Sequence, residues 1–350
     1  MGEVINGIQQ VGIGVSDTKT VFNWYRKQLG FNILLFKDEA TASLMTKYTA
    51  NVAQRRNAYL SLNLKGGGGL EIWQFLDRIP QASKNEIKLG DLGINAMKIR
   101  TSDLIKTHKL LKTLHLSFLT EMNTSQKGMN HFYFKDPWGN LVQIIEDEYL
   151  FGKTQSDCGG VMGAVIGVSN MENSLGFYRD FLGYTELISD QKVILGHLGD
   201  KQHYRQVVLR HKRDVVGGFG ELLGPTQIEL LQALDRKPVK VFENRIWGDL
   251  GYIHLCFDVQ GMAALRDKAK MLGNPFTVDS SNSFDMGDAA GHFSYVEDPD
   301  GTLIEFVETH KVPVLKSLGI YLNLKKRNPK KPLPKWLVKT LGFHRVKNDL

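Results

Sequence analysis

The sequence predicts an α+β protein of two tandem domains, in which pairs of βαβββ modules form curved half-barrels. Three observations support this prediction. A set of motifs recurs in the same order in the two halves of the chain, and the order of one strand, one helix and several strands recurs four times. The composition, with 42% apolar and 23% charged residues, is typical of a globular protein, and 350 residues suffice for two ordinary domains.

The duplication rests on five motifs whose second copies follow the first by 153 to 162 residues. They are Gly14–Asp17 with Gly167–Asn170, Trp24–Arg26 with Phe177–Arg179, Leu76–Arg78 with Leu234–Arg236, Gly90–Gly93 with Gly248–Gly251, and Asp136–Gly139 with Asp298–Gly301. Small and polar residues gather at 151–159, which indicates a linker. We therefore expect one domain at 6–150, a second at 159–310 and a C-terminal tail at 311–350.

The first module shows the local signals most clearly. Alternation in Ile8–Val15 predicts a strand, and Asp17 is a typical N-cap for the helix that follows. Val21 and Tyr25 recur at helical spacing, and Gly30 is a typical helix end. Further strands are expected at Ala58–Leu64 and Leu70–Phe75.

The other modules repeat this order. The second has a strand at Ile94–Thr101, a helix at Asp103–Leu114, and strands at Phe132–Lys135 and Leu141–Ile145. The third begins at Val161 and the fourth at Tyr252. We expect each module to pair with its neighbour within the same half of the chain, since each half repeats as a unit.

This arrangement resembles the vicinal oxygen chelate superfamily, which includes glyoxalase I, methylmalonyl-CoA epimerase, extradiol ring-cleaving dioxygenases and bleomycin-resistance proteins. The resemblance covers about residues 6–310. It rests on the Phe/Trp-Tyr-Arg and Leu-Gly motifs that open each half, and on Asp-Pro-x-Gly-x-x-x-Glu at Asp298–Glu305. It implies two glyoxalase-type domains, each a pair of modules in a curved half-barrel. It also implies a metal site with up to four ligands, on the first and last strands of two modules.

In the N-terminal half, the ligand positions implied by the resemblance hold few ligands. The first-strand position lies seven residues before the helix cap, and the four residues are Gln10, Glu71, Ala96 and Gln143. This set has one carboxylate and no histidine, so it would bind a transition metal poorly. We therefore expect the domain at 6–150 to lack a metal.

In the C-terminal half, the same spacing gives Gly163, Glu229, His254 and Glu305. Glu229, His254 and Glu305 are predicted to bind a divalent metal, and such donors suit Fe(II), Zn, Mn, Ni or Co. Gly163 has no side chain, so this position would need another group. The candidates are water, the substrate, and the histidines of the third module, which are His197, His203 and His211.

The resemblance implies a metal-dependent enzyme of the isomerase or lyase type that acts on a small oxygenated substrate. Glu229 or Glu305 would take a proton next to a metal-bound oxygen. Tyr295 matches a substrate-orienting tyrosine of extradiol dioxygenases, although Tyr133 holds the same place in the first half, which favours a structural role. Two alternatives remain: an extradiol ring-cleaving dioxygenase, which would need two histidines, and a non-catalytic binding protein of the bleomycin-resistance kind.

The basic character of the chain belongs to its tail. Lys311–Leu350 holds 11 basic residues and one acid, whereas residues 1–310 hold 33 basic and 36 acidic residues. The repeats therefore give no reason to expect nucleic acid. The tail, with a short helix expected at Trp336–Leu341, would pack on the domain or on a partner subunit, and contact with an anionic membrane surface is the alternative. A homo-oligomer remains open.

Two further expectations concern location and the tail. The N-terminus lacks a basic region followed by an apolar run, and two cysteines cannot form a disulfide framework. We therefore expect a cytoplasmic protein. No repeat unit extends past His310, so we also expect the fold to stand without the tail.

Overall fold

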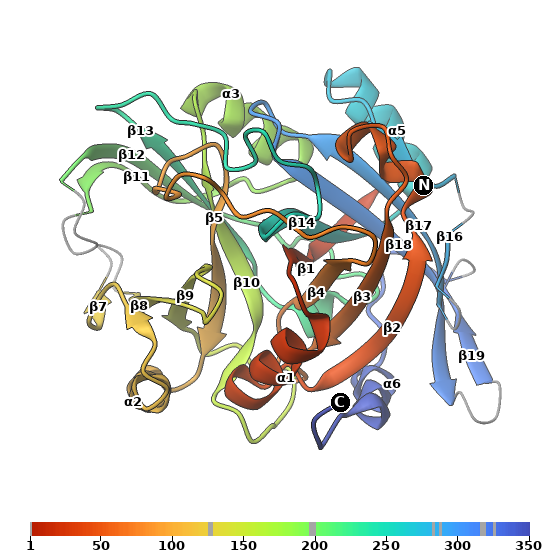
Figure 1. The fold of residues 1–350 in the computed structure, drawn as a ribbon. Coiled ribbons are helices and arrows are strands. Elements are labelled where there is room, and N and C mark those ends of the chain that lie inside the picture. Colours follow the sequence, from red (N-terminus) through yellow and green to blue (C-terminus); the bar gives the residue numbers. More distant parts are fainter. Residues whose placement is uncertain are drawn as a thin grey trace.

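Two curved sheets form the molecule in the computed structural model, with short helices around and between them (Figure 1). The structure describes residues 2–350 except 125–128, 196–200, 282–283, 287–288, 316–319 and 325–326. The first sheet has ten strands in the order β15-β17-β18-β14-β1-β4-β3-β2, with β16 and β19 attached to β17 and β18. The second has nine strands in the order β11-β12-β13-β10-β5-β9-β8-β6, with β7 attached to β8.

The elements follow the predicted module order four times. The first module contains β1 (Val4–Gly14), α1 (Thr18–Leu29), β2 (Ile33–Thr41), β3 (Arg55–Leu62) and β4 (Gly69–Phe75). The second contains β5 (Gly93–Thr101), α2 (Leu104–Lys112), β6 (Ser117–Phe118), β7 (Asn123–Thr124), β8 (Asn130–Lys135) and β9 (Leu141–Glu146). The third contains β10 (Cys158–Gly167), α3 (Met171–Leu175), β11 (Glu186–Ile194), β12 (His203–Arg210), α4 (Gly220–Leu223) and β13 (Gln227–Ala233). The fourth contains β14 (Gly251–Gln260), α5 (Met262–Met271), β15 (Val278–Asp279), β16 (Phe284–Met286), β17 (Ala289–Glu297) and β18 (Leu303–Leu315), and β19 (Ile320–Asn323) and α6 (Lys335–Lys339) follow in the tail.

The predicted fold class is confirmed, because each sheet is a pair of βαβββ modules. The expected pairing of neighbouring modules is wrong. Strand β1 of the first module pairs antiparallel with β14 of the fourth, and β5 of the second module pairs antiparallel with β10 of the third. The alternation of apolar residues defines a strand and its inner face, but it carries no signal for which module lies across the seam.

The helix caps lie where the sequence predicts them. The Asp17 carboxylate accepts hydrogen bonds from the backbone N–H groups of Lys19 and Thr20, and Asp103 does the same for Lys106. Gly30 ends α1 with a φ of 78°, a left-handed conformation that favours glycine. These caps set where α1 begins and ends and where α2 begins.

In each half of the duplication, a hydrogen bond joins the Tyr-Arg motif to the Asp-Pro-x-Gly motif of the same half. The Tyr25 hydroxyl donates to Asp136 at 2.7 Å, and the Tyr178 hydroxyl donates to Asp298 at 2.9 Å. Each bond joins the helix of one module to the Asp-Pro-x-Gly turn of the next, so it bridges the two sheets. Burial raises the pKa of both tyrosines well above the usual value, and the nearby aspartate adds to this effect.

The C-terminal tail packs on the first sheet, and the predicted short helix is present as α6 with one further turn at Thr340–His344. β19 pairs with β18, and Leu333, Val338 and Leu341 join a buried cluster with Ile33 and Leu62 of the first module. The tail therefore covers apolar surface that the repeats leave open, and the expectation that the fold stands without it stays a prediction.

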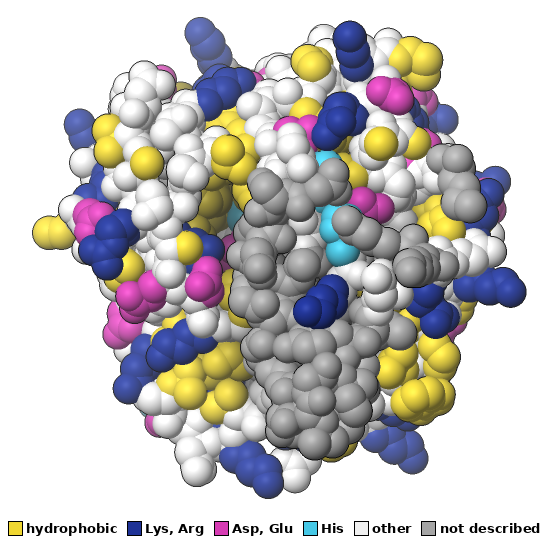
Figure 2. All heavy atoms as spheres, turned by 90° about the vertical axis from the view of Figure 1, so that its right-hand side faces the viewer, with side chains coloured by type: hydrophobic (Ala, Val, Ile, Leu, Met, Phe, Trp, Pro, Cys, Tyr) yellow, Lys and Arg dark blue, Asp and Glu magenta, His cyan; other side chains and the backbone are white. Residues whose placement is uncertain are grey.

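The surface near β16 and β19 is mixed in character. Where side chains are described on this face, Figure 2 shows Lys and Arg among acidic and hydrophobic ones. No helix among the described residues is both long enough and apolar enough to cross a membrane.

Candidate metal centre

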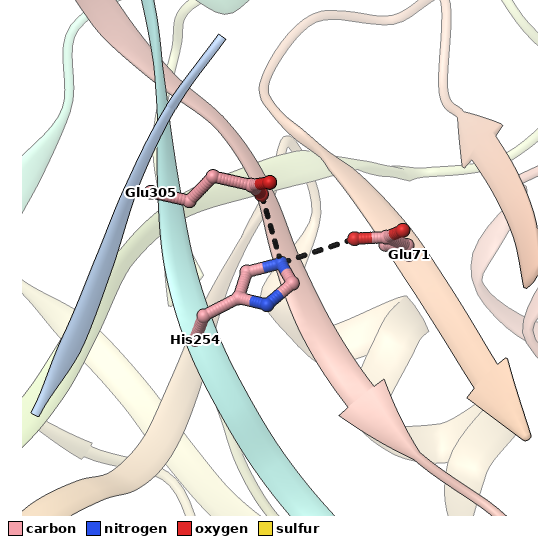
Figure 3. Close-up of side chains that lie close together, drawn as sticks. All are labelled: Glu71, His254 and Glu305. Carbon is pink, nitrogen blue, oxygen red and sulfur yellow. Dashed lines mark ion pairs between the residues drawn. The ribbon is translucent and has the colours of Figure 1, made fainter. Parts of the chain in front are cut away.

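Three side chains that can ligate a metal converge inside the first sheet (Figure 3). Glu71 comes from β4, His254 from β14 and Glu305 from β18. Their ligand atoms all lie within 4.8 Å of one another. Because β1 carries β4 on one side and β14 on the other, the sheet brings a carboxylate of the first half of the chain against a histidine of the second.

The imidazole of His254 lies between the two carboxylates. Its Nε2 atom is 3.1 Å from Glu71 Oε2 and 3.2 Å from Glu305 Oε2, and the His254 side chain has no exposed surface. Among the described residues, neither His254 Nε2 nor Glu305 Oε2 has a hydrogen-bond partner of good geometry. Buried polar atoms without partners are costly, so these atoms point to a group that would satisfy them.

Three neighbours surround the triad. Gln10 of β1 is buried, and its Nε2 donates to Glu71 Oε2 at 3.2 Å, whereas its own Oε1 has no partner among the described residues. The Tyr295 hydroxyl lies 3.4 Å from His254 Nδ1. The ring of Trp247 stacks on the imidazole at a centroid distance of 6.2 Å. Together Tyr295 and Trp247 fix the imidazole so that Nε2 points at the carboxylates.

The charges of the triad depend on one another. Burial opposes a charge on His254, but Glu305 and Glu71 outweigh it and raise the pKa of the imidazole. Burial, together with repulsion from Glu71, raises the pKa of Glu305 to about 7. Burial acts in the same sense on Glu71, but the nearby His254 imidazole, the charge of Arg56 and the hydrogen bond from Gln10 lower its pKa. The two carboxylates therefore differ in proton affinity.

A cavity of about 330 Å³ opens beside the triad. Glu71, Glu305 and Tyr295 lie in its wall together with the aromatic rings of Trp73 and Trp247. Arg56 also lines it and forms an ion pair with Asp38 at 2.9 Å. The cavity therefore joins the two carboxylates to an apolar wall and to one guanidinium.

The structure does not bring Glu229 to this centre. Glu229 lies on β13 in the second sheet, where its Oε2 forms an ion pair with Lys98 and its Oε1 accepts a hydrogen bond from Gln206 at 2.5 Å. His254, Glu305 and Tyr295 do lie together, as the sequence predicts. Glu229 was assigned to them because the third and fourth modules were expected to share one half-barrel, and they do not.

The other predicted substitutes are also elsewhere. His203 is exposed and pairs with Asp235 at 2.8 Å, and His211 is buried beside the ring of Tyr184. His197 lies outside the described residues. Gly163 lies in the second sheet, opposite Gln227 of β13, so it leaves no gap in the triad.

The sequence did contain the signal for Glu71 and Gln10. Both hold ligand positions that the resemblance implies for the first half of the chain, and that half has no histidine at such a position. The first sheet combines these two positions with His254 and Glu305 of the fourth module. The second sheet combines the remaining four, Ala96, Gln143, Gly163 and Glu229. The grouping of these positions by halves of the chain is therefore wrong.

Comparison with known proteins places the fold. A model of the Glyoxalase/Bleomycin resistance protein/Dioxygenase superfamily matches residues 7–144 and 161–306. The structure of glyoxalase I from Zea mays is similar, with a TM-score of 0.56, 15% identity, and 87% of this chain and 93% of that chain covered. A "putative dioxygenase" from Bacillus subtilis has a TM-score of 0.55 and 12% identity, and covers 87% of this chain and 85% of its own. No curated protein sequence matches the chain.

Proposed function

Because this chain belongs to the Glyoxalase/Bleomycin resistance protein/Dioxygenase superfamily, we propose that it is a metal-dependent enzyme of the isomerase or lyase type. The metal would be held by Glu71, His254 and Glu305, and the substrate would be a small oxygenated compound. The observation that carries the proposal is the convergence of three ligand atoms within 4.8 Å, deep in the sheet and beside a cavity.

The residues fit a divalent transition metal. One imidazole nitrogen and two carboxylate oxygens suit Zn, Fe(II), Mn, Ni or Co. A metal would satisfy His254 Nε2 and Glu305 Oε2, which otherwise have no good hydrogen-bond partner among the described residues. The unpartnered Oε1 of Gln10 supplies a fourth donor next to Glu71. With Nε2 as the ligand, Nδ1 of His254 keeps its proton and faces the Tyr295 hydroxyl, an outer contact that orients the ring.

The chemistry of the site follows from its carboxylates. A bound metal would act as a Lewis acid on a substrate oxygen, which makes a neighbouring C–H more acidic. Glu305 is the better candidate for the general base, because its Oε2 has no hydrogen-bond partner among the described residues, whereas Glu71 is held by the hydrogen bond from Gln10. Trp73 and Trp247 would pack on the carbon part of the substrate and exclude water. Arg56 would hold an anionic end.

Metal binding by variants tests the ligand set. Full-length protein, loaded and then desalted, should retain one metal per chain by elemental analysis. His254→Ala and Glu71→Gln should each lower this content strongly, because each removes a donor. Glu229→Gln is the matched control, since Glu229 is a buried glutamate at the corresponding place in the other sheet, and it should leave the metal content unchanged. Full retention in His254→Ala would reject the assignment.

Reaction type is tested separately. Metal-loaded enzyme in anaerobic D₂O should exchange hydrogen for deuterium at the carbon next to the carbonyl of α-hydroxycarbonyl compounds, and NMR would detect this. Glu305→Gln should stop the exchange. If the chain is instead an extradiol dioxygenase, its turnover of catechols should consume O₂. That reaction would need two histidines, and the triad found among the described residues holds one. Metal binding without either activity would favour a binding protein.

A further inference from the structure

The second sheet contains a cavity of about 540 Å³ at the place that corresponds to the metal centre. The strand registers establish the correspondence. Lys98 lies opposite Gln143 on parallel strands, as Cys256 lies opposite Glu305. Val165 lies opposite Glu229 as Gly12 lies opposite Glu71, and Tyr133 lies opposite Gln143 as Tyr295 lies opposite Glu305.

Two of the three metal-ligating side chains of the first sheet have no counterpart at the corresponding positions of this cavity. The cap spacing that selects His254 selects Ala96 here, and Gln143 stands where the first sheet has Glu305. Only Glu229 is kept, and both of its oxygens are occupied: Oε2 by the ammonium of Lys98, and Oε1 by Gln206. Lys98 stands where the first sheet has Cys256, so the chain supplies its own cation to the glutamate. The second sheet therefore has a cavity at this place without the ligand triad of the first sheet.

Several polar groups in the wall are left to meet a ligand. The Lys98 side chain is 2% exposed, and Glu229 is the one acceptor described for its three N–H donors. The Gln143 side chain is buried, and its Oε1 has no partner among the described residues. Both residues line the cavity. A buried ammonium with free donors calls for an acceptor, and a buried amide oxygen calls for a donor.

Charge and shape narrow the class of ligand. Lys98 is the one lysine or arginine buried in the described wall, since Lys192 is exposed, and the N–H donors that Glu229 leaves open are best met by a charged acceptor. The remaining wall is mixed, and Ile145, Val193, Leu195 and Val208 are among its apolar residues. A ligand that matches these features carries one carboxylate, one hydroxyl group and an apolar body.

We propose that the second half-barrel is a metal-independent binding site for a small hydroxy acid with an apolar body. The carboxylate accepts hydrogen bonds from Lys98 Nζ, the hydroxyl donates to Gln143 Oε1, and the apolar part packs on Val193, Leu195 and Val208. Glu229, which accepts a hydrogen bond from Gln206, holds the ammonium in place. The proposal is independent of the metal centre, because no residue is shared between the two cavities.

Calorimetric titration of the full chain with 3-phenyllactate, in excess EDTA, tests the proposal. We expect saturable binding, weaker binding of 3-phenylpropionate, which lacks the hydroxyl, and weaker binding of 3-phenyllactamide, which lacks the charge. The double variant Lys98→Met/Glu229→Gln removes the buried pair at similar volume and should weaken 3-phenyllactate binding by about tenfold or more. His254→Ala should bind it as the wild type does.

A second variant protects the test from a folding defect. Gln143→Leu keeps the size of the side chain and leaves the ion pair intact, so it should fold. It should bind 3-phenyllactate and 3-phenylpropionate equally, because the acceptor for the hydroxyl is gone. The proposal is overturned if 3-phenyllactate shows no saturable binding, or if the double variant binds it as tightly as the wild type does. It is also overturned if Gln143→Leu still prefers 3-phenyllactate over 3-phenylpropionate as strongly as the wild type does. Loss of binding in His254→Ala would place the ligand at the metal centre instead.

Discussion

At the scale of single residues, Glu71 and Glu229 show how neighbours decide the role of a side chain. Both are glutamates at the same register position of their sheets. Glu71 faces an imidazole whose Nε2 has no good hydrogen-bond partner among the described residues, whereas Glu229 faces the ammonium of Lys98. Burial alone would raise the pKa of Glu229, but Lys98 and Gln206 reverse the effect and lower it. A carboxylate neutralised in this way has little left to offer a metal.

Asp258 on β14 gives a test of residue-scale electrostatics. It is buried, accepts hydrogen bonds from Asn6 at 2.7 Å and Gln9 at 3.4 Å, and has its pKa raised by burial to about 7. Its unfolded value is near 4, so the folded state binds the extra proton between these values. This contribution to stability is complete at low pH and is lost as pH rises from about 4 to 7.

We therefore expect Asp258→Asn to flatten one part of the pH dependence. The free energy of unfolding of the variant, relative to wild type, should increase as pH rises from about 4 to 7 and stay constant above that range. Urea unfolding at a series of pH values measures this difference. Other groups, such as the buried His211 with its pKa lowered to about 4, titrate in both proteins and cancel. A difference that does not change with pH would show that Asp258 is charged throughout.

At the scale of elements, the seam between the sheets depends on close backbone approach. The glycine run Gly66–Gly69 between β3 and β4 lies at this seam, where Gly68 and Val161 exchange backbone hydrogen bonds of 2.7 and 2.8 Å across the halves of the chain. A Cβ on Gly67 would lie 2.6 Å from Gly160, and Gly67 also has a φ of 124°. Glycine is needed here for contact with the other half, a reason that a local pattern does not reveal.

The tail gives an element-scale prediction with an internal control. Leu341 is buried with Ile33 and Leu62, whereas Phe343, two residues later, is 73% exposed. Leu341→Ala should lower the free energy of unfolding by about 2–4 kcal/mol, because it leaves a cavity in a packed cluster. Phe343→Ala should change it by less than about 0.5 kcal/mol. Urea denaturation of both variants gives the comparison, and equal effects would mean that the tail is not packed in solution.

At the scale of the whole molecule, strand, cap and module order could be predicted from the sequence, because period-two alternation, Asp17 and Gly30 are local signals. The ligand positions Gln10, Glu71, His254 and Glu305 are those that the resemblance to the vicinal oxygen chelate superfamily implies, counted from these local signals. The grouping of modules could not be predicted, since β1 offers the same edge to β5 or to β14. That one ambiguity accounts for both errors at the site: the inclusion of Glu229 and the dismissal of Glu71.

The cross-pairing of the halves leads to the last prediction. Each half contributes two strands at the seams, β1 and β5 from residues 1–150 and β10 and β14 from the remainder. A half produced alone exposes both of its edges, which favours dimers or aggregates. When the two halves are refolded together, they should form a one-to-one complex. Size-exclusion chromatography with light scattering measures its mass. Only this complex should bind the metal, because Glu71 lies on one half and His254 and Glu305 lie on the other.

His254→Ala in the C-terminal half should abolish metal binding while the complex still forms. If each half instead folds as a monomer and the C-terminal half alone retains a metal, the first and fourth modules do not share a sheet in solution.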